Sequence, residues 1–82
     1  MITFGSRNRN CIMDIEWVGD FKIEVGLDND NAVVISANRD GLLSLARQLT
    51  TLADESVGCH IHYDDHNSLE DGSIEMIIQK RW

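Results

Sequence analysis

Apolar and polar residues alternate with a period of two in several short segments, which predicts strands with one buried face. The first such segment is 11–17 (Cys-Ile-Met-Asp-Ile-Glu-Trp) and the second is 21–27. Gly19 and Asp20 lie between them and predict a turn, so the two segments are expected to form an antiparallel hairpin. The run 28–31 (Asp-Asn-Asp-Asn) predicts a second turn, because short Asx side chains bond to nearby backbone. A β-branched strand is predicted next, over 32–36.

The period changes to that of a helix at Asn38, whose side chain can cap the first turn. The helix is predicted over 39–54. Its apolar stripe is expected to pack on a sheet and comprises Leu42, Leu45, Ala46, Leu49, Leu52 and Ala53, widened by Leu43. The opposite, polar side comprises Arg39, Ser44, Arg47, Gln48, Thr51 and Asp54.

Two further alternating segments, 59–63 and 73–80, complete the order βββαββ. This order predicts an α+β fold of two layers, in which one helix packs on one face of a largely antiparallel sheet of about five strands. We expect a single domain over 1–82, with 1–10 as a poorly ordered N-terminal segment. The other face of the sheet would be open and would carry His60 and His62. No apolar run approaches the length that spans a membrane.

The charge of the chain indicates which class of partner the open face could bind. The chain has 14 acidic residues against 7 Lys and Arg and a net charge of -7, which argues against nucleic acid as a partner. Residues 48–79 contain no Lys or Arg but hold seven acids: Asp54, Glu55, Asp64, Asp65, Glu70, Asp71 and Glu75. Such a concentration favours a basic protein partner. A merely solubilising surface is the alternative.

The sequence contains only weak motifs for catalysis or metal binding. No nucleophile elbow or phosphate-binding loop occurs, so we expect no enzyme. His60 and His62, with Asp64, could chelate a metal, and His66, Glu70 or Glu75 could add ligands. Cys59 should point to the opposite face, however, so we expect neither a metal nor another cofactor, and a pH-dependent contact is favoured. Cys11 and Cys59 are expected to be two small buried hydrophobes, with a disulfide between them as the alternative.

Three motifs occur in order in the second half of the chain: Asn38-x-x-Gly41-Leu42, His60-x-His62, and Leu69-Glu70-x-Gly72-Ser73. Over residues 32–80 the chain resembles immunity protein family 32 of bacterial polymorphic toxin systems. The resemblance implies a cytoplasmic, non-enzymatic protein that binds and neutralises a cognate toxin, and it assigns no toxin-contact residues.

The contacts must therefore be predicted from the residues themselves. Our candidates for partner binding are His60, His62, Asp64, Asp65, Glu70, Asp71 and Glu75. The expected partner is a basic toxin, with neither nucleic acid nor a membrane involved. A homo-oligomeric binding module, such as a homodimer formed through a strand edge or the open face, is the alternative.

Overall fold

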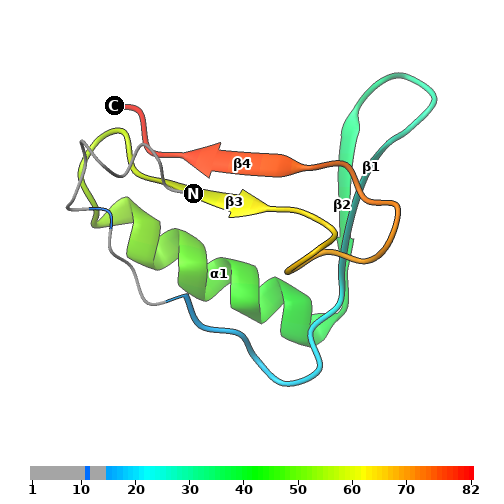
Figure 1. Cartoon of the computed structure of the whole chain (residues 1–82), viewed down its shortest axis with the longest axis horizontal. Coiled ribbons are helices and arrows are strands. Elements are labelled where there is room, and N and C mark those ends of the chain that lie inside the picture. Colours follow the sequence, from blue (N-terminus) through cyan, green and yellow to red (C-terminus); the bar gives the residue numbers. More distant parts are fainter. Residues whose placement is uncertain (1–10, 12–14) are drawn as a thin grey trace.

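The computed structural model describes residue 11 and residues 15–82. Its elements are β1 (Ile23–Leu27), β2 (Val33–Ala37), α1 (Arg39–Ala53), β3 (His60–Tyr63) and β4 (Met76–Gln79). The helix runs alongside β3 and β4, and the β1–β2 hairpin stands across one end of this layer (Figure 1). None of the described helices is long and apolar enough to cross a membrane.

The predicted α+β class is confirmed, but the single five-stranded sheet is wrong. The described residues form four strands in two antiparallel pairs, β1–β2 and β3–β4. The strand predicted over 11–17 is not formed in its described part, since Cys11 and residues 15–17 belong to no strand. Residues 12–14 of that strand, and the predicted terminal segment 1–10, lie outside the described residues.

Helix side chains explain why residues 15–20 form no strand. The Gln48 Nε2 donates to the carbonyl of Glu16 at 2.9 Å, and the Ser44 Oγ accepts from the backbone N–H of Val18 at 2.8 Å. The Asp40 carboxylate accepts from the N–H of Asp20 at 3.1 Å. Polar side chains of α1 thus satisfy backbone groups that a neighbouring strand would otherwise satisfy, and β1 pairs with β2 instead.

The segment between β3 and β4 joins the two sheets. Its Glu70 N–H donates to the carbonyl of Ile23 at 2.8 Å, and its Ile74 N–H donates to that of Val25 at 2.8 Å. The Ser73 Oγ accepts from the N–H of Val25 at 3.1 Å. Residues 70–74 therefore cover the edge of β1 that faces away from β2. This is why the strand predicted over 73–80 begins only at Met76; it ends at Gln79.

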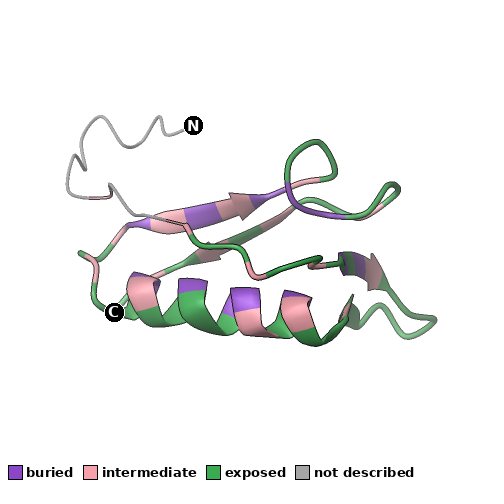
Figure 2. Ribbon diagram, turned by 90° about the horizontal axis from the view of Figure 1, so that it is seen from below, coloured by how far each residue is buried: buried purple, intermediate pink, exposed green. Residues whose placement is uncertain are grey.

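The helix begins and ends close to its predicted bounds, and Asn38 caps it by accepting from the Gly41 N–H at 2.7 Å. Its buried side differs from the predicted stripe and comprises Gly41, Ser44, Leu45, Gln48 and Leu52 (Figure 2). Leu42 and Leu49 are 55% and 39% exposed. The rotation follows from the segment 15–20, which gives Ser44 and Gln48 backbone partners and so allows these polar side chains to be buried.

The core lies between the helix and the strands. It consists of Ile23, Val25, Leu45, Leu52, Cys59, Ile61, Tyr63 and Leu69. Cys59 is fully buried and forms a disulfide with Cys11 across 48 residues of sequence. The alternative interpretation of the cysteines is therefore confirmed, and their interpretation as two unlinked hydrophobes is wrong.

Candidate functional site

The predicted contact residues lie on β3 and on the segment that joins it to β4. We call His60, His62, Asp64, Asp65, Glu70, Asp71 and Glu75 the acidic surface. Burial alternates along β3: Ile61 and Tyr63 are buried, whereas His60 and His62 are half-buried. The register places His60 opposite Gln79 and His62 opposite Ile77. The predicted outward face with two histidines is thus present, although its sheet has two strands.

His62, Asp64 and Glu75 come together at the end of β3. One ligand atom from each lies within 4.8 Å of the others, and the His62 Nε2 contacts the Glu75 carboxylate. The predicted chelating set was His60, His62 and Asp64, so Glu75 takes the place of His60. One imidazole and two carboxylates could hold a divalent cation, but a hydrogen bond between His62 and Glu75 accounts for the arrangement equally well. The expected absence of a metal remains a prediction.

Asp64 also stabilises the loop that follows β3. Its Oδ1 accepts from the backbone N–H groups of His66 and Asn67, at 3.0 and 3.1 Å. Its carbonyl accepts from the N–H groups of Ser68 and Leu69, at 3.1 and 2.8 Å. These bonds turn the chain after β3 and bring the buried Leu69 into the core. The Asp64 carboxylate is therefore committed to the shape of the loop.

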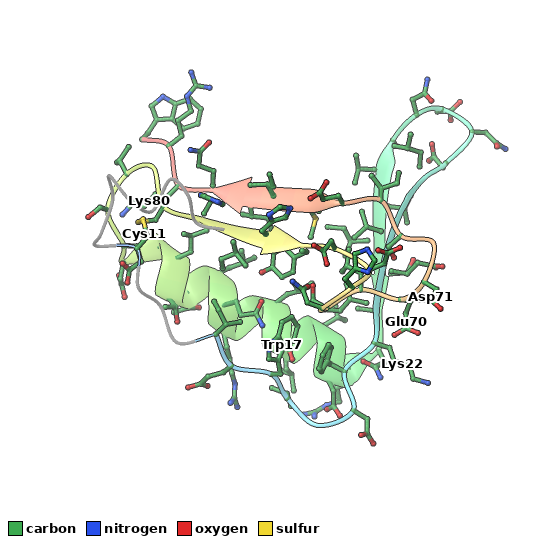
Figure 3. All side chains as sticks on the ribbon, in the orientation of Figure 1. Cys11, Trp17, Lys22, Glu70, Asp71 and Lys80 are labelled. Atoms are coloured by element: carbon green, nitrogen blue, oxygen red, sulfur yellow. A yellow bond between two sulfur atoms is a disulfide. The ribbon has the colours of Figure 1, made fainter. Side chains whose placement is uncertain are left out.

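The remaining acids are displayed outward. Asp65, Glu70 and Asp71 are exposed, and the Asp65 carboxylate lies 3.7 Å from the imidazole of His66. Glu70 and Asp71 lie at one edge of the molecule near Lys22 (Figure 3). Lys22 and Glu70 line the same shallow depression of about 460 Å³. Because residues 70–74 are bonded to β1, these carboxylates are held on a fixed backbone.

Sequence reasoning missed a buried polar chain beneath the acidic surface. The hydroxyl of Tyr63 donates to the Gln48 Oε1 at 2.7 Å. The Gln48 Nε2 in turn donates to the carbonyl of Glu16. Burial raises the pKa of Tyr63 to about 12. Gln48 shares a helix face with Leu45 and Leu52, and this spacing was the available signal.

A second contact that the sequence did not predict lies at the other end of β4. The ammonium of Lys80 donates to the carbonyls of Ala53 and Glu55, each at 2.7 Å. Both carbonyls lie at or just past the C-terminus of α1, where a cation also complements the helix dipole. Lys80 therefore attaches β4 to the helix.

A family model described as Immunity protein 32 matches residues 32–81. The match covers more than half of the 82 residues and includes β2, α1, β3 and β4. The chain belongs to the Immunity protein 32 family. Neither the curated proteins nor the solved structures contain a significant match. The Immunity protein 32 match includes the whole acidic surface, whereas β1 and residues 15–20 precede it.

Proposed function

We propose that this chain neutralises a cognate toxin by binding it through the acidic surface. Membership of the Immunity protein 32 family is the observation that carries the proposal, since an immunity protein implies a toxin partner. The chain would act by occlusion rather than by chemistry. The proposed site of action is the cytoplasm.

Charge and rigidity support the choice of surface. Residues 48–79 contain no Lys or Arg, and Asp65, Glu70, Asp71 and Glu75 are all exposed. A concentrated negative field speeds the encounter with a basic protein by roughly 10- to 1000-fold at low salt. The hydrogen bonds of Glu70 and Ile74 to β1 hold the loop backbone in place, so little ordering entropy would be lost on binding.

The test is the association rate with the toxin domain encoded beside this chain, measured by surface plasmon resonance at increasing salt. A triple variant, Asp65→Asn, Glu70→Gln and Asp71→Asn, removes three exposed charges. It spares Asp64, whose carboxylate shapes the loop. We expect the association rate to fall by roughly tenfold and to lose part of its salt dependence.

A matched control removes the same number of charges elsewhere: Asp30→Asn, Asp54→Asn and Glu55→Gln. These positions lie in the β1–β2 turn and after α1. We expect the control to slow association much less. Equal rates for the two variants would show that only net charge matters and would refute the acidic surface as the contact. The absence of any complex at low salt would refute the proposed function itself.

A further inference from the structure

Strand β2 exposes an apolar run on both of its faces. Val33, Val34 and Ile35 are 63%, 41% and 42% exposed, and the strand Val33–Ala37 contains neither a charged residue nor a proline. Natural proteins usually protect such an edge with charges, prolines or a covering segment. An unprotected edge of β-branched residues is therefore typical of a surface that pairs with another strand.

The hydrogen-bond pattern shows which backbone groups point outward. The N–H of Asn38 donates to the carbonyl of Lys22 at 3.1 Å, and the N–H of Asp28 donates to the carbonyl of Ala32 at 3.0 Å. Antiparallel partners alternate between bonded and non-bonded pairs. The backbone groups of Val33, Ile35 and Ala37 therefore point away from β1. No described residue pairs with them, whereas residues 70–74 cover the far edge of β1.

We propose that β2 pairs antiparallel with β2 of a second copy of this chain, centred on Ile35. In this register Ile35 faces its own equivalent, and Val33 faces Ala37 of the other copy. Each of these three residues presents its free N–H and carbonyl to the partner, so every outward group is satisfied. The two hairpins become one four-stranded sheet with a two-fold axis, as expected for an isologous dimer.

Charge favours a second copy in this orientation. Two copies with a net charge of -7 each repel one another, but β2 itself is uncharged and allows close approach. The acidic turn with Asp28 and Asp30 precedes β2, and the exposed Arg39 follows it. Antiparallel pairing places Arg39 of each copy beside the acidic turn of the other. Parallel pairing would instead bring turn against turn and Arg39 against Arg39.

The decisive experiment is sedimentation equilibrium of the purified chain, without toxin, over a wide range of concentrations. We expect a monomer–dimer equilibrium that Val33→Pro weakens at least tenfold. This change removes an outward N–H at the first residue of an edge strand, where proline is tolerated, and leaves the bonds between β1 and β2 intact. Val33→Thr keeps the N–H and should dimerise normally. Circular dichroism confirms that both variants fold.

A charge exchange tests the register. Arg39→Glu should weaken the dimer, and adding Asp30→Lys to it should restore dimerisation. A monomer at every concentration, a dimer that Val33→Pro leaves unchanged, or failure of the exchange to restore dimerisation would each overturn the proposal. A monomer whose toxin binding is lost with Val33→Pro would assign the edge to the toxin and would likewise overturn it. Because the dimer is measured without toxin, its failure leaves the proposed function standing.

Discussion

Gly41 provides the sharpest test of the packing between α1 and β1. A Cβ at this position would lie 2.5 Å from the carbonyl oxygen of Lys22, 2.9 Å from the Ile23 Cγ1 and 3.1 Å from the Ala37 Cβ. The nearest of these atoms belongs to the backbone and also accepts the N–H of Asn38 at 3.1 Å. Accommodating a methyl group therefore requires the helix to move away from β1 and strains the bonds around the N-cap.

Two opposing effects determine the outcome of Gly41→Ala. In a helix, replacing glycine with alanine stabilises by about 1 kcal/mol. Forcing a methyl group into a packed site costs about 1–3 kcal/mol, and weakening the Asn38–Lys22 hydrogen bond costs about 1 kcal/mol more. We expect a net loss of about 2 kcal/mol, which corresponds to roughly 8–16 °C in Tm for a domain of this size.

The measurement is urea denaturation followed by circular dichroism, with a thermal melt alongside it. Gly26→Ala in β1 is the control, because a Cβ there meets nothing within 4 Å; we expect its stability to change little or to rise. If Gly41→Ala is as stable as the original chain, or more stable, then helix propensity governs this site and the close approach to Lys22 is refuted.

Three further predictions concern contacts between segments that lie far apart in the sequence. Burial raises the pKa of Tyr63 to about 12, above the ~10 of unfolded tyrosine. The free energy of unfolding should therefore fall between about pH 10 and pH 12, by up to about 3 kcal/mol. Since this is the single tyrosine of the chain, ultraviolet absorbance reports its ionisation, and Tyr63→Phe should remove this part of the pH dependence. Reducing the disulfide frees a loop of 48 residues and should lower stability by about 4 kcal/mol; unchanged urea midpoints with and without reductant would contradict its role. Lys80→Met removes two hydrogen bonds to carbonyls at the end of α1 and should cost about 1–3 kcal/mol, whereas Arg81→Met at the exposed neighbour should cost much less.

The sequence alone determined the features that depend on neighbouring residues. The helix, its Asn38 cap and the outward direction of His60 and His62 were all predicted, because period and capping are local properties. The seven candidate contact residues were also chosen from local patterns, namely strand alternation and the concentration of acidic residues. The structure brings three of them together, His62, Asp64 and Glu75, and commits one of these, Asp64, to the shape of its loop.

Only the tertiary structure decided which elements are partners. Alternation predicts which face of a segment is buried, but not which strand the segment pairs with. Residues 15–17 were therefore predicted to lie in a strand. In the structure, backbone groups within residues 16–20 bond to helix side chains instead. The buried face of α1 is rotated away from the predicted apolar stripe, because Ser44 and Gln48, on the predicted polar side, find backbone partners in residues 15–20. The disulfide between Cys11 and Cys59 likewise depends on distant segments meeting. These outcomes arise from long-range hydrogen bonding and packing, and local residue patterns do not specify them.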